Sequence, residues 1–269
     1  MKNIHCSMFP GGRQRALTLS YDDGTIHDRR LVEIMNRHGI RGTFHLNGGR
    51  LGADGGRFLS REEVAVLFQG HEVSAHSLTH PFLDALPPSQ VAVEMLEDRR
   101  ALEALVGYPV RGMSYPCGTY NEALRQQLPA LGIEYSRTVQ STDGFDVPSD
   151  FLQWDPTCHH KSPKLMELAD RFLAPGKKWR PCLFYLWGHS YEFENDKNWE
   201  LIERFSGCVG GREDVWYATN IEIVDYLNAC RGLRFAFAGN AVCNPAGLEV
   251  WIDVDGTAVR VPPGQTVRL

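Results

Sequence analysis

Short runs of β-branched and aromatic residues alternate along this chain with segments that repeat apolar residues at helical spacing. Parallel strands need a crossover connection, usually a helix, so the alternation indicates repeated βα units. We therefore predict an α/β fold, a distorted (β/α) barrel of about seven parallel strands. The expected strands cover residues 16–20, 42–46, 71–75, 111–115, 133–139, 151–154 and 183–187.

Capping signals mark the ends of the intervening helices. Ser60 and Glu63 have the spacing of a capping box, and Asn121 can cap a helix that ends near Gly132. A longer helix is expected to follow Pro87-Pro88-Ser89. The apolar stripes of these helices are expected to fill the core.

The pattern changes after Gly232. There the sequence EVWIDVDGTAVRVPPGQTVRL alternates apolar and polar residues about an Asp255-Gly256 turn, which predicts a β-hairpin. A chain of 269 residues can close one large core. We predict a barrel over residues 1–232 and a small β-hairpin extension over residues 233–269 that packs on it.

Composition excludes some classes of partner. Lys and Arg number 28 against 33 Asp and Glu, the net charge is −5, and no basic cluster suited to nucleic acid or acidic lipid occurs. We expect neither nucleic acid nor a membrane as partner. No apolar stretch of signal-peptide length precedes the first expected strand, and the seven cysteines lack CxxC spacing. We predict a cytoplasmic protein with free thiols, each of which serves as a small buried hydrophobe.

Polar residues that directly follow apolar runs are the candidates for chemistry, because function gathers at the carboxyl ends of parallel strands. Asp22 and Asp23 follow the first expected strand, and His189 follows the last. His76 and His80, four residues apart, point the same way if they lie on one helical turn. Asp23, His76 and His80 would then form a catalytic zinc site with one open position. The competing interpretation is a chance histidine pair beside aspartates that cap helices.

Three segments resemble the NodB-like polysaccharide deacetylases, carbohydrate esterase family four, and the resemblance covers roughly residues 14–230. It implies that Asp22 is the general base and His189 the general acid. It also implies that Asp23, His76 and His80 bind Zn²⁺ or another divalent metal such as Co²⁺ or Ni²⁺. The segments are Ser20-Tyr21-Asp22-Asp23-Gly24, His76-Ser77-Leu78-Thr79-His80 and Leu186-Trp187-Gly188-His189.

A further motif of this family, Arg-Pro-Pro-Tyr-Gly, corresponds here to Ser114-Tyr115-Pro116-Cys117-Gly118, which lacks the arginine that would hold the base. Arg111 would face the opposite side of its strand, so we expect Arg137, at the end of the next strand, to take that role. The resemblance implies that the backbone N–H of Cys117 stabilises the oxyanion, which does not depend on the side chain.

The family's Asp-Trp pair, which tunes the catalytic histidine, has only a reversed counterpart in Trp154-Asp155. Histidines and aromatic residues nearby are candidates for substrate contact, although aromatic residues beside apolar strands more often fill the core. The candidate substrate-binding residues are Tyr115, Trp154, Asp155, His159, His160 and Tyr191.

The predicted function is a metal-dependent hydrolase that removes acetyl groups from an acetylated sugar, oligosaccharide or polysaccharide by metal-activated water. One alternative is an amidase of the same superfamily that acts on a small molecule. Another is a carbohydrate-binding protein whose chemistry has lapsed, which the absent motif arginine and the β extension favour. The sequence indicates neither the sugar, nor the acetyl linkage, nor the oligomeric state.

Overall fold

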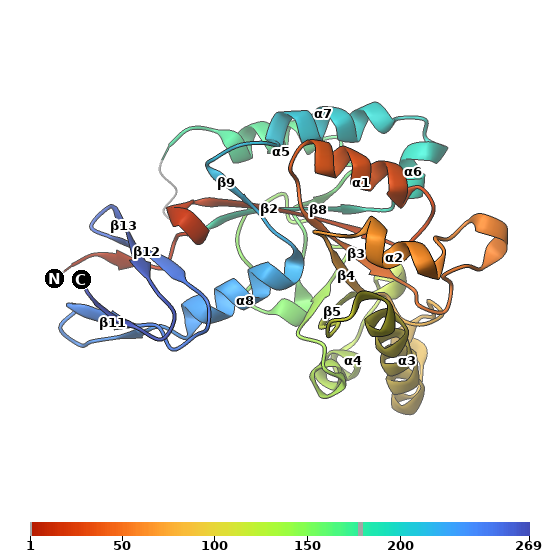
Figure 1. Cartoon of the computed structure of the whole chain (residues 1–269), viewed down its shortest axis with the longest axis horizontal. Helices are drawn as coiled ribbons and strands as arrows, with labels where there is room; N and C mark the ends of the chain where they lie inside the picture. The colour runs from red at the N-terminus through yellow and green to blue at the C-terminus, as the bar shows by residue number, and fades with distance from the viewer. Residues whose placement is uncertain (1, 177–179) are drawn as a thin grey trace.

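A curled parallel sheet forms the body of the protein in the computed structural model, which describes residues 2–176 and 180–269. Within these residues the strand order is β6-β5-β4-β3-β2-β8-β7, with β9 also paired to β2 (Figure 1). All of these pairings are parallel, and the predicted (β/α) barrel class is confirmed. The strands are β2 (Arg15–Asp22), β3 (Gly42–Leu46), β4 (Glu72–Ala75), β5 (Gly112–Ser114), β6 (Tyr135–Arg137), β7 (Cys158–His159), β8 (Cys182–Gly188) and β9 (Val215–Tyr217).

Helices cover the outer surface of the sheet, and α1 and α7 lie side by side along β2 and β8 (Figure 1). The predicted capping box of Ser60 and Glu63 is present, and the side chain of Asn121 accepts a 2.8 Å hydrogen bond from Leu124 N–H. No helix in the described part of the chain has the length and apolar character needed to cross a bilayer. The helices are α1 (Asp28–Arg37), α2 (Arg61–Leu67), α3 (Pro88–Val106), α4 (Glu122–Gln127), α5 (Leu165–Leu173), α6 (Ser190–Asn195), α7 (Trp199–Val209) and α8 (Asn220–Arg231).

The expected strand at 151–154 is wrong. Residues Phe151–Gln153 form a 3-10 turn, because the Asp150 carboxylate accepts a 2.8 Å hydrogen bond from Leu152 N–H and caps that turn. Trp154 instead makes a single parallel bridge to Arg137, and β7 pairs with β8 a few residues later. The segment 154–159 thus connects the two edges of the curled sheet.

The chain after α8 forms the predicted β extension. Asp255 and Gly256 both adopt left-handed backbone angles, with φ of 51° and 87°, at the turn of the expected hairpin. Val250 and Ile252 of the hairpin share a hydrophobic cluster with Phe9 and Tyr226 of the barrel. Because β1 pairs with β12, the start of the chain joins the extension, and the division at residue 232 stays a prediction. The strands are β1 (Ile4–His5), β10 (Arg234–Phe235), β11 (Ala241–Cys243), β12 (Val250–Val254), β13 (Thr257–Val261) and β14 (Thr266–Arg268).

All seven cysteines are free thiols, as expected. Cys158 and Cys182 are buried, but Cys6 and Cys117 are exposed, so the expectation that each cysteine is a buried hydrophobe is wrong for these two. Cys117 is exposed because it lies in a tight turn after β5 with a left-handed φ of 58°.

Trp154→Ala is expected to destabilise the fold by about 3–5 kcal/mol, as for other large aromatic truncations in a core. The Trp154 ring lies 4.9 Å from Tyr185 and 5.7 Å from both Tyr135 and Phe151, measured between ring centroids. Urea unfolding followed by circular dichroism measures the change. Trp154→Phe is the control and should cost much less, since it keeps a ring in place. A free energy of unfolding for Trp154→Ala within about 1 kcal/mol of the wild type would contradict this role.

Candidate active site

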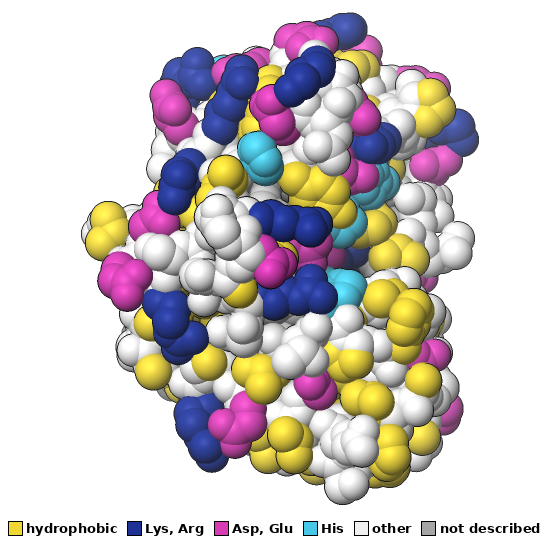
Figure 2. Space-filling view, turned by 90° about the vertical axis from the view of Figure 1, so that its right-hand side faces the viewer, with side chains coloured by type: hydrophobic (Ala, Val, Ile, Leu, Met, Phe, Trp, Pro, Cys, Tyr) yellow, Lys and Arg dark blue, Asp and Glu magenta, His cyan; other side chains and the backbone are white. Residues whose placement is uncertain are grey.

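A cavity of about 250 Å³ lies at the carboxyl ends of the strands and collects residues from all the motifs. Figure 2 views this end of the molecule, where acidic and histidine side chains lie in a hollow flanked by Lys and Arg side chains. Segments more than a hundred residues apart in the sequence meet here. The lining residues are Asp22, Asp23, His76, His80, Tyr115, Cys117, Gly118, Val139, Trp187, His189 and Tyr191.

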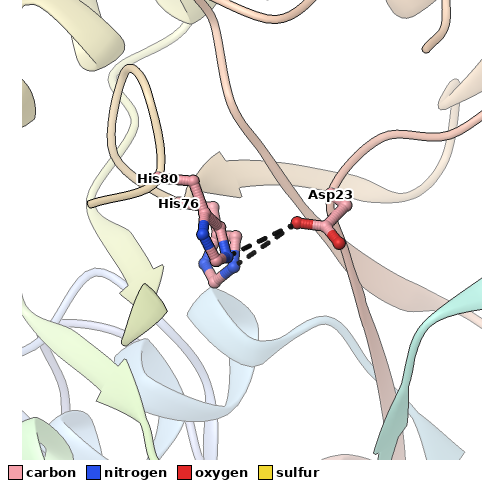
Figure 3. Close-up of side chains that lie close together, drawn as sticks. All are labelled: Asp23, His76 and His80. Carbon is pink, nitrogen blue, oxygen red and sulfur yellow. Dashed lines mark ion pairs between the residues drawn. The ribbon is translucent and has the colours of Figure 1, made fainter. Parts of the chain in front are cut away.

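Asp23, His76 and His80 form one group of possible metal ligands. The Nε2 atoms of His76 and His80 lie 3.8 and 3.7 Å from Asp23 Oδ1 (Figure 3). Asp23 Oδ1 is buried and has no hydrogen-bond partner among the described residues, as expected for an atom that awaits a cation. Zinc bonds of about 2.0–2.2 Å to each atom need only a small contraction of these separations. The donor set therefore fits a divalent metal.

The expected helical turn between the two histidines is wrong. Residues 76–80 form a loop in which Ser77 and His80 adopt left-handed φ angles of 61° and 64°. Asn47 Nδ2 donates to the carbonyl oxygens of His76 and Ser77, the latter at 2.8 Å, and Asp98 Oδ2 accepts from His76 N–H at 3.0 Å. Neither Asn47 nor Asp98 is predicted from the sequence, because neither lies near the histidines in the chain.

His76 presents a defined nitrogen to Asp23. Its Nδ1 lies 3.0 Å from the backbone oxygen of Ser114, so Nδ1–H donates there and Nε2 keeps its lone pair. Burial lowers the pKa of His76 to about 3, and the nearby carboxylate of Asp22 only partly opposes this effect. His76 is therefore the neutral imidazole that a metal requires.

Asp22 is held by a buried ion pair. Its Oδ2 accepts a hydrogen bond from Arg137 Nη2, and its Oδ1 accepts from the Ser114 hydroxyl at 3.2 Å. Arg137 is thus the partner expected from the sequence, whereas Arg111 pairs with Glu134 and Asp225. Burial alone would raise the pKa of Asp22, but the Arg137 guanidinium holds it well below its usual range. Asp22 stays ionised and able to accept a proton.

His189 has a carboxylate partner that the sequence analysis missed. Glu192 Oε2 lies 3.2 Å from His189 Nδ1 and 3.1 Å from His159 Nε2, and it also accepts the His189 backbone N–H at 3.1 Å. Although burial opposes it, the hydrogen bond to Glu192 raises the pKa of His189 above its ordinary value. Because the pair is also a capping box of α6, the His-x-x-Glu spacing was a usable signal.

His159, His160 and Glu192 form a second group with the composition of a metal site. His159 Nδ1, however, accepts a 3.1 Å hydrogen bond from Lys161 N–H, so its Nε2 carries the proton and donates to Glu192. Lys161 Nζ also lies 3.2 Å from Glu192 Oε1 and already supplies a positive charge. These contacts favour a hydrogen-bonded network over a cation.

Four of the predicted substrate contacts have side chains that are not available to a sugar, although Tyr115 lines the cavity. Trp154 and His160 are each only 1% exposed, and the His160 ring stacks between Tyr21 and Phe193, so neither offers a surface to a sugar. Tyr115 is also 1% exposed and donates its hydroxyl to Leu152 O at 2.8 Å. Asp155 accepts a hydrogen bond from Thr138 and does not line the cavity.

The remaining candidates are better placed. Tyr191 is half-buried and lines the cavity, whereas His159 reaches the site through Glu192. Cys117 also lines the cavity, with Sγ 3.8 Å from His80 Nδ1. Asp23, with φ of 81°, and Cys117, with 58°, adopt left-handed angles that are unfavourable outside glycine. Such backbone strain is concentrated at functional sites.

The fold and the site together define a parallel (β/α) barrel protein whose rim carries a possible metal site of one carboxylate and two imidazoles. The polysaccharide deacetylase family model matches residues 10–136. The peptidoglycan-N-acetylglucosamine deacetylase of Bacillus cereus is 28% identical over 144 residues, which cover 51% of this chain and 50% of that protein. The chitooligosaccharide deacetylase of Rhizobium leguminosarum bv. phaseoli is 29% identical over 120 residues, which cover 44% and 49%. The chain spans about half the length of the curated relatives it matches.

Solved structures show the same fold. A crystal structure from Mycobacterium smegmatis, whose assignment as a polysaccharide deacetylase is itself provisional, gives a TM-score of 0.61 at 17% identity over 83% of this chain and 93% of that one. The family 4 carbohydrate esterase from Streptomyces lividans in complex with acetate gives 0.51 at 16% identity over 77% and 93%. The resemblance read from the motifs is confirmed by the polysaccharide deacetylase family model, which matches residues 10–136.

Removal of one ligand is expected to abolish metal binding, since two ligands hold a divalent ion too weakly to survive dialysis. After incubation with zinc and dialysis, Asp23→Ala and His76→Ala should retain less than about a tenth of an equivalent, against about one equivalent in the wild type. Inductively coupled plasma mass spectrometry measures the content. His189→Ala is the control and should keep its metal. Full metal retention in His76→Ala would show that the ion binds elsewhere.

Proposed function

We propose that this protein is a metal-dependent hydrolase that removes acetyl groups from an acetylated carbohydrate. The observation that carries the proposal is that one cavity holds an ionised carboxylate, Asp22, beside the metal-type group of Asp23, His76 and His80, with a histidine of raised pKa, His189, in its wall. This set matches the requirements of acyl hydrolysis: a base, an electrophilic centre and an acid.

A divalent metal held by Asp23, His76 and His80 would supply Lewis acidity, which polarises a carbonyl and brings the pKa of water toward about 7. Asp22 accepts the proton of the attacking water, since Arg137 keeps its carboxylate ionised and oriented. The backbone N–H of Cys117 donates to the oxyanion that develops on the acetyl carbonyl. His189 donates its Nε2 proton to the departing oxygen or nitrogen, while Glu192 holds the proton on Nδ1.

Zinc is our proposed ion, with Co²⁺ or Ni²⁺ as substitutes, because neutral imidazole and carboxylate ligands suit these metals. We further propose a reducing, cytoplasmic location, which the seven free cysteines support. An amidase acting on a small molecule uses the same chemistry, so a panel of acetylated sugars and simple amides separates the two. The intact acid and base argue against a lapsed site.

Asp22→Asn and His189→Ala should each lower kcat by about 10²–10⁴-fold, the usual contribution of a general base or acid. Acetate release from acetylated oligosaccharides by the zinc-loaded protein measures the rate, and the metal content of each variant is determined in parallel. Asp170→Asn, an exposed change in α5 away from the cavity, is the control and should keep the wild-type rate. If both site variants hydrolysed the substrate at that rate, the assigned roles would be wrong.

Glu192→Gln should shift the pH profile. The acid form of His189 is needed, so activity falls as the pH rises through the pKa of His189, which Glu192, Asp22 and Asp23 raise. Without the Glu192 charge this pKa falls, and the alkaline limb of kcat/KM is expected to move down by about one pH unit.

Glu194→Gln on the same helix is the matched control, because Glu194 pairs with Lys197 and Trp199 and touches none of the histidines. An alkaline limb in Glu192→Gln that coincides with those of the wild type and Glu194→Gln would exclude Glu192 as the group that tunes His189.

A further inference from the structure

Two arginines near the cavity, neither of which lines it, have no carboxylate partner among the described residues. Arg50 is half-buried and Arg57 is exposed, and in the part of the chain that the structure describes neither guanidinium lies within ion-pair distance of a carboxylate. Neighbouring arginines behave differently: Arg29 pairs with Glu63 at 2.7 Å and Arg41 with Glu222 at 2.6 Å. Guanidinium groups without a carboxylate partner are available to an anionic ligand.

The loop that carries both arginines is fixed to the site. Arg57 O accepts a 3.1 Å hydrogen bond from Ile26 N–H, and Phe58 forms a bridge with Thr25, just after Asp23. Arg50 Nη2 donates to Thr79 O at 3.1 Å, in the loop that bears the metal-type histidines. The arginines are therefore attached to the two segments that supply Asp23 and His80.

One aromatic ring orients the two side chains. The Cζ atoms of Arg50 and Arg57 lie 5.7 and 5.5 Å from the ring centroid of Phe58, which is buried. Cation–π contacts of this kind limit the motion of a guanidinium and leave its N–H groups free to donate. Figure 2 shows Lys and Arg side chains next to the acidic and histidine surface at the middle of this face.

The carboxylates at the floor of the cavity do not neutralise the positive charge of Arg50 and Arg57. Asp22 is neutralised by Arg137, and Asp23 faces His76 and His80, where a divalent cation would leave an excess of positive charge. Guanidinium groups match carboxylates in planar, two-point hydrogen bonds, and a positive rim attracts an anionic substrate from solution.

We propose that Arg50 and Arg57 bind a carboxylate of the substrate, and that the preferred substrate is an acetylated saccharide with an acidic sugar unit, such as a uronic acid, next to the acetylated position. The proposal rests on the proposed deacetylase function and adds to it the charge of the substrate. A neutral acetylated sugar would leave both guanidinium groups without a carboxylate partner.

The test compares one substrate with and without its charge. Acetate release is measured from an O-acetylated oligogalacturonate and from its methyl ester, which differ only in the carboxylate. The wild type is expected to prefer the acid by about tenfold or more in kcat/KM, and the preference should weaken as salt rises from about 50 to 500 mM. Arg57→Gln and Arg50→Gln should each reduce the ratio of acid to ester several-fold, while Arg57→Lys retains part of it.

Arg37→Gln is the matched control. Arg37 ends α1, pairs with Glu203 at 2.9 Å and lies outside the cavity, so its loss changes the net charge equally and should leave the ratio unchanged. Equal rates on acid and ester, or an equal loss of the ratio in Arg37→Gln, would overturn the proposal.

A second measurement separates this proposal from the proposed function. If the zinc-loaded protein releases acetate from a neutral N-acetylglucosamine trimer but does not distinguish acid from ester, only the charge preference is wrong. If no substrate is hydrolysed, the deacetylase function is wrong. Calorimetric binding of unacetylated oligogalacturonate then tests whether Arg50 and Arg57 bind a carboxylate. Weaker binding in Arg57→Gln than in Arg37→Gln would support the arginine site, and equal binding would overturn it.

Discussion

The buried ion pair between Asp22 and Arg137 is the contact on which the site depends. Asp22 ends β2 and Arg137 ends β6, and three strands separate these two in the sheet order. Their side chains meet only because the sheet curls far enough to bring its edge toward its centre. Removal of one partner would leave an unpaired buried charge, which costs far more than the pair contributes. The curl of the sheet and the orientation of the base are thus coupled.

Neighbouring contacts extend this pair into the metal-type group. The Ser114 hydroxyl lies 3.2 Å from Asp22 Oδ1 and 2.7 Å from His76 Nδ1, so base and ligand share one small side chain. The Arg137 guanidinium lies 4.1 Å from the centroid of the Trp187 ring, on the strand that leads to His189. A shift of β6 would therefore alter the base, one ligand and the approach to the acid together.

The parts of the site that depend on local chain order could be predicted from the sequence, because they lie at strand ends and in motifs. Asp22, Asp23 and His189 lie where apolar runs end, and β2 and β8 end there in the structure. What the sequence could not supply are contacts made across the fold, such as the Asp98 carboxylate that accepts the His76 N–H. The loop at 76–80 was read as helical because four-residue spacing describes a helix and says nothing of left-handed backbone angles. The error at 151–154 has the same origin, since Asp150 caps a turn that competes with a strand.

The family match ends at residue 136; it includes the motif position that lacks an arginine, whereas the residues that compensate for the departures lie beyond it. Asp22, Asp23, His76 and His80 lie inside the match, whereas Arg137 is the first residue after it. The motif position that lacks an arginine holds Ser114, whose hydroxyl reaches Asp22 but carries no charge, so the guanidinium comes from the next strand. Similarly, the carboxylate next to His189 is that of Glu192, whereas the Asp155 carboxylate accepts a hydrogen bond from Thr138 instead. In both cases a different residue places the required charge at the same atom, because the chemistry constrains the position of the charge and leaves open which segment delivers it.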